Sequence, residues 1–182
     1  MEAIPIHSLA VFCGSKNGST PLFIEHAVQL GKILVTHNVT LIYGGGNVGI
    51  MGTIANAVMD HGGKATGVIP QVLVDWERQH NSLSELLVVD DMHTRKKKMY
   101  ELCDAAIILP GGFGTLDELF EMVTWNQLSI HDKQIFILNS GGFYNHLIAH
   151  IQQMQKEKFL YEEAQKRLMV INEPSEIINF LN

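Results

Sequence analysis

The segment LPGGFGTLDELFE, from Leu109 to Glu121, combines two kinds of residues that can do chemistry. Its glycines let the backbone bring N–H groups close to an anion, and the start of the following helix adds partial positive charge. Its acids, Asp117, Glu118 and Glu121, would repel that anion. The segment therefore predicts one ligand with an anionic group at one end and an electron-poor centre at the other.

The acids have two interpretations. If Thr115 begins the helix, Glu118 and Glu121 share one face and Asp117 points away from them. Thr115 and Glu118 also form the pattern of a capping box, which would explain the helix start but not the glycines. In the functional interpretation, a carboxylate faces the sugar of a nucleotide. It stabilises the oxocarbenium-like centre that forms when an N-glycosidic bond breaks, or it activates water.

Arg95 lies in the segment DDMHTRKKKM and should follow a strand. Its planar guanidinium can bind a phosphate or a carboxylate at two points. A cation near the positive end of a helix is disfavoured, and a ligand anion or Glu118 would offset that cost. The alternative is an ordinary charged helix surface, which is the usual role of a run such as RKKK, Arg95 to Lys98.

Two further glycine loops, FCGSKNGST and YGGGNVGIMG, follow apolar runs. They add Gly14, Ser15, Gly44, Gly45 and Gly46 as expected substrate contacts. The second loop matches the dinucleotide pattern G-x-G-x-x-G, but no acid lies between Asp60 and Asp75, where the ribose contact is expected. The phosphate loop G-x-x-x-x-G-K-[ST] of nucleoside-triphosphate hydrolases is absent. A nucleoside monophosphate fits these loops better.

The elements that position these residues alternate between short apolar runs and longer stretches of helical period. This pattern predicts an α/β fold in one domain, residues 1–182: a doubly wound parallel sheet flanked by helices, with ligands at the carboxyl ends of the strands. The irregular stretch from Pro70 to Glu85 is expected to form a loop over the site. Strands are expected at 9–13, 40–43, 65–69, 86–89, 105–109, 134–138 and 169–171, and helices at 21–37, 50–61, 93–103, 115–128, 143–157 and 175–181.

Composition limits the class of protein. The chain has 182 residues, 46% of them hydrophobic, which is typical of a globular domain. A formal charge of −6 argues against a nucleic-acid binder. With no apolar run of about 18 residues and no signal-peptide pattern at the N-terminus, we expect no membrane association and a cytoplasmic protein. Cys13 and Cys103 are expected to be buried thiols rather than nucleophiles.

Four segments together resemble the Lonely Guy family of cytokinin riboside 5′-monophosphate phosphoribohydrolases: PGGFGTLDE (110–118), YGGGNVGIMG (43–52), FCGS (12–15) and MHTRK (92–96). The resemblance implies a Rossmann-like fold with the signature PGGxGTxxE. It also implies that Arg95 and Glu118 are the catalytic pair and that Gly112 to Thr115 hold the phosphate. The substrate contacts in the signature and beyond it would be Gly111, Gly112, Phe113, Gly114, Thr115, Glu77, Lys96 and Thr124.

The activity implied by this resemblance is hydrolysis of adenosine 5′-monophosphate, preferably N6-prenylated, to the free base and ribose 5-phosphate. No metal or organic cofactor is implied, and two copies are expected to pair through helices beside the site. Two alternatives stay open: a non-catalytic nucleotide-binding or carrier module with the same loops, and plain AMP as the substrate. The family is often labelled lysine decarboxylase, but no residue pattern here predicts pyridoxal phosphate.

Overall fold

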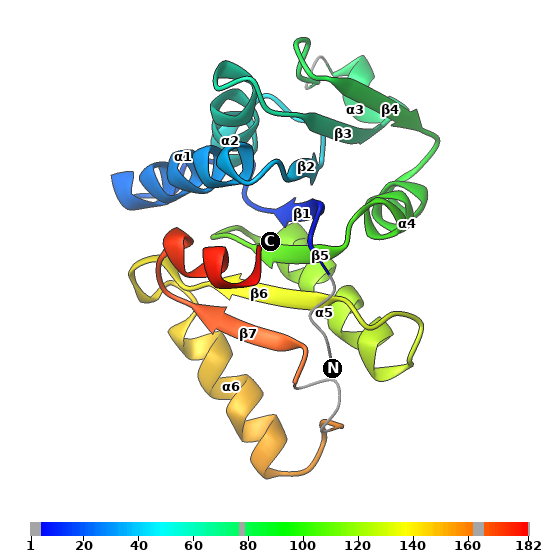
Figure 1. Ribbon diagram of the computed structural model, residues 1–182. Helices are drawn as coiled ribbons and strands as arrows, with labels where there is room; N and C mark the ends of the chain where they lie inside the picture. The colour runs from blue at the N-terminus through cyan, green and yellow to red at the C-terminus, as the bar shows by residue number, and fades with distance from the viewer. Residues whose placement is uncertain (1–4, 77–78, 162–165, 182) are drawn as a thin grey trace.

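A seven-stranded parallel sheet forms the centre of the computed structural model, which describes residues 5–76, 79–161 and 166–181. The strand order is β4-β3-β2-β1-β5-β6-β7, and every neighbouring pair is parallel (Figure 1). All seven strands expected from the sequence are present, with ends within one residue. They are β1 (Ser8–Phe12), β2 (Thr40–Tyr43), β3 (Ala65–Pro70), β4 (Glu85–Val89), β5 (Ala105–Ile108), β6 (Gln134–Leu138) and β7 (Leu168–Ile171).

Helices connect the strands as expected, with two corrections. The stretch after Pro70 is not irregular throughout, since it contains a short helix that sequence periodicity missed because one turn and a half is too short to show a period. The helix of the signature segment begins at Phe113, not at Thr115. The helices are α1 (Pro21–Thr36), α2 (Gly49–Asp60), α3 (Gln71–Asp75), α4 (Met92–Leu102), α5 (Phe113–Gln127), α6 (Asn145–Lys156) and the 3-10 helices η1 (Ser140–Gly142) and η2 (Pro174–Phe180).

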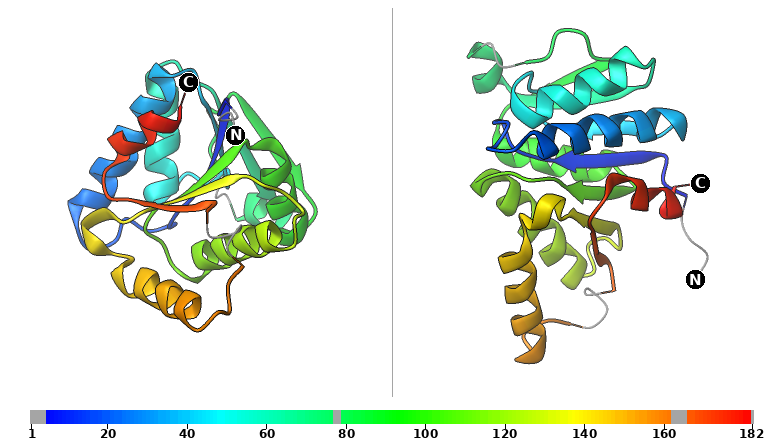
Figure 2. Two further views of the ribbon diagram at one scale, coloured as in Figure 1. Left: turned by 60° about the horizontal axis from the view of Figure 1, so that its bottom comes forward. Right: turned by 90° about the vertical axis from the view of Figure 1, so that its left-hand side faces the viewer.

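The core consists of two apolar layers, one on each face of the sheet. Because successive side chains of a strand point to opposite faces, Val11 packs in the layer covered by α1, α2 and η2, whereas Phe12 packs in the layer covered by α4, α5 and α6. Figure 2 shows these helices on the two sides of the twisted sheet. Central strands such as β5 are therefore buried on both faces and read as continuous apolar runs.

The strand order determines where the site lies. From β1 the chain adds β2, β3 and β4 on one side, and then crosses back to add β5, β6 and β7 on the other side. The loops that follow β1 and β5 therefore leave the sheet in opposite directions, and a crevice opens between them at the carboxyl ends of the strands.

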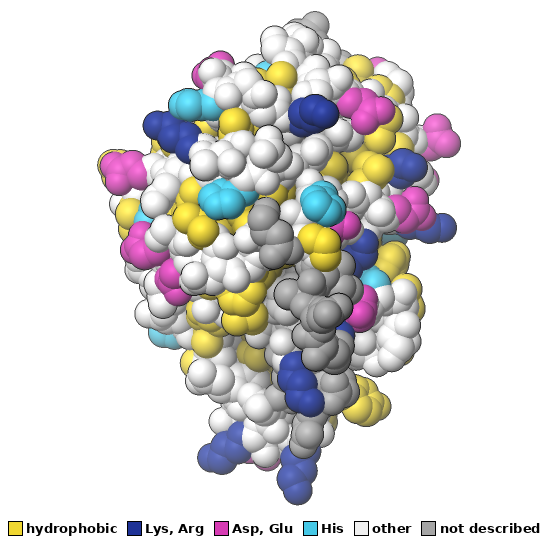
Figure 3. Space-filling model, in the orientation of Figure 1, with side chains coloured by type: hydrophobic (Ala, Val, Ile, Leu, Met, Phe, Trp, Pro, Cys, Tyr) yellow, Lys and Arg dark blue, Asp and Glu magenta, His cyan; other side chains and the backbone are white. Residues whose placement is uncertain are grey.

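The face of the molecule drawn in Figure 3 is mixed in charge. On the face seen in Figure 3, acidic and basic side chains are interspersed among uncharged ones. Among the described residues, no helix is both long and apolar enough to cross a membrane.

Candidate functional site

Three glycine loops meet at the carboxyl edge of the sheet, as expected. Gly14, after β1, donates its N–H to the carbonyl of Pro110, after β5, at 3.0 Å. The carbonyl of Gly14 in turn accepts from the N–H of Met51 in α2 at 3.4 Å. These bonds hold the loops together around a cleft of about 910 Å³. The expected site residues that line it are Gly14, Ser15, Gly44, Gly46, Arg95, Lys96, Gly111, Gly112, Phe113, Gly114, Thr115 and Glu118.

The signature loop presents the start of α5 to the cleft. Gly112 is the N-cap residue and no side chain caps the helix, so the capping-box interpretation of Thr115 is wrong. The Thr115 side chain instead lies buried beneath Gly111, where a Cβ on the glycine would overlap it. The N–H groups of the first turn have no partner within the helix, which makes this loop a suitable cradle for a phosphate.

Arg95 enters the cleft from α4. Asp91 caps that helix by accepting from the N–H groups of His93 and Thr94 at 2.8 Å each. The guanidinium is buried, with 7% of the residue exposed, and its Nε donates to the carbonyl of Val68 at 3.0 Å. Its Nη2 donates to the carbonyl of Gly44 at 3.3 Å, where a Cβ on Gly44 would overlap it. The ends of β2 and β3 thus fix this arginine in one orientation.

Glu118 faces Arg95 from the second turn of α5. Its Oε1 lies 3.8 Å from Nη1 of Arg95, and only 8% of the residue is exposed. Burial raises the pKa of the Glu118 carboxyl from 4.5 to about 7, although Arg95 acts to lower it. A carboxyl group with a pKa near neutrality can serve as a base, as an acid or as a charge stabiliser, and such groups cluster at functional sites.

Lys96 does not point freely into the cleft. Its Nζ lies 2.9 Å from Oδ2 of Asp117 and 2.8 Å from Oε2 of Glu121. Asp117 therefore faces the same neighbour as Glu121, and the expectation that it points away is wrong. The i and i+4 positions of a helix lie side by side, so one cation can bind both acids.

The walls of the cleft include residues that sequence reasoning missed. Phe23 of α1 and Phe143 after β6 contact each other edge to face, 5.5 Å between ring centroids, and both line the cleft. Nothing local in the sequence marks either residue. Trp76, at the end of α3, also lines the cleft, whereas Trp125 packs against Tyr100 at 5.1 Å between centroids.

Two of the expected site residues that the structure describes do not line the cleft. Gly45 is buried against Ile69 and Leu86 and does not line the cleft. Thr124 is exposed on α5 and does not line it either. Glu77 lies outside the described residues.

Cysteine and histidine side chains are the other candidates for a nucleophile or a metal site. Cys13 lines the cleft, but its burial raises the pKa of its thiol well above the usual range, and Glu118 adds to this effect. His146 and His150 are exposed on α6. Within the described parts of the chain, no cluster of three or more His, Cys, Asp or Glu side chains is placed to hold a metal ion.

Solved structures share the fold. The molybdenum cofactor binding protein from the phototrophic bacterium Rippkaea orientalis superimposes with a TM-score of 0.72, covering 98% of this chain and 96% of that chain at 20% sequence identity. The molybdenum cofactor (Moco) carrier protein from Chlamydomonas reinhardtii gives a TM-score of 0.68 over 94% of this chain and 93% of that chain at 19% identity. At these identities the likeness concerns the fold.

Curated relatives are much closer in sequence. The probable cytokinin riboside 5′-monophosphate phosphoribohydrolase LOGL2 of Oryza sativa subsp. japonica is 42% identical over 173 residues, which are 95% of this chain and 71% of that protein. The cytokinin riboside 5′-monophosphate phosphoribohydrolase LOG4 of Arabidopsis thaliana is 44% identical over 175 residues, 96% of this chain and 80% of that protein. The family model described as "Possible lysine decarboxylase" matches residues 51–181. The chain therefore belongs to this family, the Lonely Guy (LOG) family of its curated relatives.

Proposed function

We propose that this protein hydrolyses the N-glycosidic bond of an adenosine 5′-monophosphate and releases the free base and ribose 5-phosphate. The observation that carries the proposal is the buried Glu118 carboxyl opposite Arg95 in a cleft whose edge is the uncapped start of α5. A binding module needs the glycine loops but has no use for a buried carboxyl with a pKa near 7. The names of the curated relatives agree with this activity.

Each group has a distinct role in the proposed reaction. The N–H groups of residues 112–115 bind the phosphate, which places the ribose beside Glu118. As the bond between C1′ and the base breaks, its electron pair leaves with the base. The Glu118 carboxylate stabilises the positive charge on the sugar and orients the water that adds to C1′. Arg95 orients Glu118 and binds the ribose or phosphate side. The departing base takes up one proton, which is balanced by the proton that the water loses as it adds to C1′.

The apolar part of the cleft supports a base with an apolar substituent. Leu73, Trp76 and Met92 line the cleft from α3 and from the start of α4. A prenyl group on the exocyclic amine of adenine would bury apolar surface against such side chains, at about 25 cal/mol per Å². We therefore propose the prenylated nucleotide as the preferred substrate over plain AMP.

Incubation with AMP and with isopentenyl-AMP, followed by chromatography of free base and ribose 5-phosphate, tests the activity. Glu118→Gln should lower kcat by about 10²-fold or more, and Arg95→Ala should also lower it strongly. Glu101→Gln is the matched control, since its side chain is 53% exposed on α4 and pairs with the surface lysines Lys97 and Lys98. Binding of nucleotide without release of base from either substrate would refute the proposal and favour a carrier module.

We also propose a homodimer in which a second copy completes the site. Phe113 and Phe120 on α5 are 94% and 41% exposed, the C-cap residue Leu128 is 65% exposed, and Thr124 lies among them. An apolar stripe of this kind is typical of a protein interface. If Thr124 contacts the nucleotide, it does so in the cleft of the second copy.

Light scattering after gel filtration measures the oligomeric state. Phe120→Asp should convert dimers to monomers, because an aspartate carboxylate would be desolvated in the interface. A wild-type protein that is monomeric at all concentrations would refute this part of the proposal.

Two broader proposals concern the chain as a whole. We propose that residues 1–182 act as one catalytic domain, since all seven strands join in one sheet. We also propose a cytoplasmic location, where thiols such as the buried Cys13 and Cys103 stay reduced. Cell fractionation with an antibody tests the location, and limited proteolysis that separates two stable pieces would refute the single domain.

A further inference from the structure

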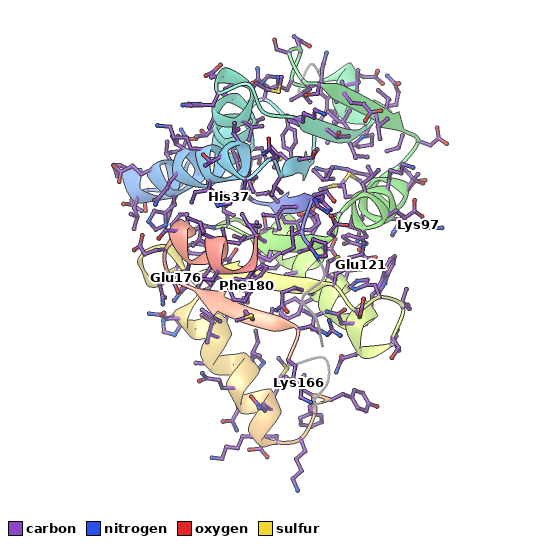
Figure 4. The ribbon with its side chains drawn as sticks, viewed as in Figure 1. His37, Lys97, Glu121, Lys166, Glu176 and Phe180 are labelled. Atoms are coloured by element: carbon purple, nitrogen blue, oxygen red, sulfur yellow. The ribbon has the colours of Figure 1, made fainter. Side chains whose placement is uncertain are left out.

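The charged groups between α4 and α5 form a cluster that the proposed chemistry does not explain. The cluster consists of Lys96 and Tyr100 on α4, and Asp117 and Glu121 on α5. Two acids one turn apart on a helix repel each other. Here both bind the same ammonium group, and burial leaves only 9% of the Lys96 side chain exposed. In Figure 4, Glu121 lies on the side of α5 that faces α4, whereas Lys97 lies on the outer side of α4.

Tyr100 holds Glu121 in place. Its hydroxyl donates to Oε2 of Glu121 at 2.8 Å, the same oxygen that binds Lys96. Tyr100 is 2% exposed, and its ring packs edge to face against Phe12 of β1 and Trp125 of α5. A buried ring with contacts on two sides has little rotational freedom. Its hydroxyl is therefore a fixed donor for the Glu121 carboxylate.

The position of Lys96 matters for Glu118. The charged and titratable groups coupled to Glu118 include Arg95, Lys96 and Tyr100 from α4, Asp117 and Glu121 from α5, and the Cys13 thiol after β1. Among the described residues, Arg95 is the one cation within ion-pair distance of the Glu118 carboxylate, at 3.8 Å. Lys96 follows Arg95 directly but binds Asp117 and Glu121 instead.

We propose that Glu121, held by the Tyr100 hydroxyl, is a positioning residue of the site: it keeps the Lys96 ammonium between itself and Asp117 and away from Glu118. An ammonium group has three donors, and two of them are occupied by the acids, so one remains for a ligand in the cleft that Lys96 lines. The kinetic consequence rests on the proposed hydrolysis, whereas the placement of Lys96 does not.

The arrangement affects the ionisation of Glu118 in a defined direction. Burial is the main cause of its raised pKa, Glu121 and Asp117 add to it, and Arg95 and Lys96 oppose it. If Glu121 loses its charge or its support, Lys96 is less neutralised and is free to approach Glu118. Both effects lower the pKa of Glu118.

The direct test is a titration of the Glu118 carboxyl carbon by NMR in substrate-free protein, with the signal assigned by its loss in Glu118→Gln. Glu121→Gln should lower the titration midpoint by about half a pH unit or more, as expected for removal of one charge a helical turn away. Tyr100→Phe should shift the midpoint in the same direction by a smaller amount, although it changes no charge. Glu101→Gln, the control on the outer face of α4, should leave the midpoint unchanged.

Tyr100→Phe decides between positioning and simple charge repulsion. If its Glu118 midpoint equals that of Glu101→Gln, the proposal is overturned. This variant keeps the ring and its packing, so it carries the test even if Glu121→Gln fails to fold.

The kinetic test is the acid limb of kcat/KM, which reports ionisations of the free enzyme and substrate. In Glu121→Gln and Tyr100→Phe the limb should move to lower pH than in Glu101→Gln. The phosphate of the substrate ionises near pH 6 in every assay, so it does not contribute to differences between variants. A wild-type protein without hydrolytic activity would refute the proposed function, and the NMR titration would still decide the role of Glu121.

Discussion

Replacement of Glu118 by Gln separates the charge of the buried carboxyl from its shape. Burial raises the pKa of this group from 4.5 to about 7. The folded protein therefore binds the proton more tightly than the unfolded chain, so the Glu118 contribution to the free energy of unfolding is fully present below about pH 4.5 and is lost as the pH rises through 7. At about 1.4 kcal/mol per pKa unit, the loss is about 3 kcal/mol.

The side-chain amide of the Glu118→Gln variant cannot ionise, so this variant should show no such loss. The free energy of unfolding of the wild type, relative to Glu118→Gln, should fall by about 3 kcal/mol between pH 4.5 and pH 8 and stay constant above it. For a chain of this size that is a change of about 6–12 °C in the Tm difference. Only the change with pH is used, so differences in packing between Glu and Gln cancel.

Urea unfolding at half-unit steps from pH 4.5 to pH 8.5 measures the difference, with Glu101→Gln as the control on the exposed face of α4. The control should differ from the wild type by a constant amount across this range. If the difference in free energy of unfolding between the wild type and Glu118→Gln is also constant, the pKa of Glu118 is not raised. The carboxyl is then not poised near neutrality.

Three further predictions concern the framework of the site. Gly44→Ala should lower kcat/KM by about 10²-fold, because the added Cβ displaces the Arg95 guanidinium. Normal kinetics would contradict the close contact. Tyr144→Phe should lower the free energy of unfolding in urea by about 1–3 kcal/mol, since the hydroxyl donates to the buried carbonyl of Leu109 at 2.7 Å. An unchanged urea midpoint would argue against this bond. Cys13 and Cys103 should react with a thiol reagent at pH 8 only after unfolding. Burial raises the pKa of both thiols, that of Cys103 to about 11. Fast labelling of the folded protein would refute their burial.

The strands and most helices could be predicted because their signals are local. The apolar run of β5 and the helical period of α1 depend on neighbours within a few residues. Parallel strands also end at a common edge, so the glycine loops could be assigned to one site before their contacts were known. Glu118 follows one of these glycine loops and Arg95 follows β4, and the structure brings their side chains to 3.8 Å.

The start of α5 shows where a local signal fails. Thr115 with Glu118 matches a capping box, yet Gly112 is the N-cap residue and Thr115 is buried under Gly111. The loop before α5 is held by a contact with the loop after β1, through Gly14 and Pro110. That contact joins residues about a hundred positions apart, and no short-range pattern contains it.

The sequence by itself determined the strand pattern, the glycine loops and the residue types at the cleft, because periodicity and backbone preference act over a few residues. The tertiary structure alone decided that Lys96 binds Asp117 and Glu121, that Tyr100 supports Glu121, and that Phe23 meets Phe143. These pairs form because the strand order places β1 beside β5, and this sets α4 against α5 on one face of the sheet and brings α1 close to the loop after β6. Which side chains become neighbours depends on how whole elements pack, and that is a property of the complete chain.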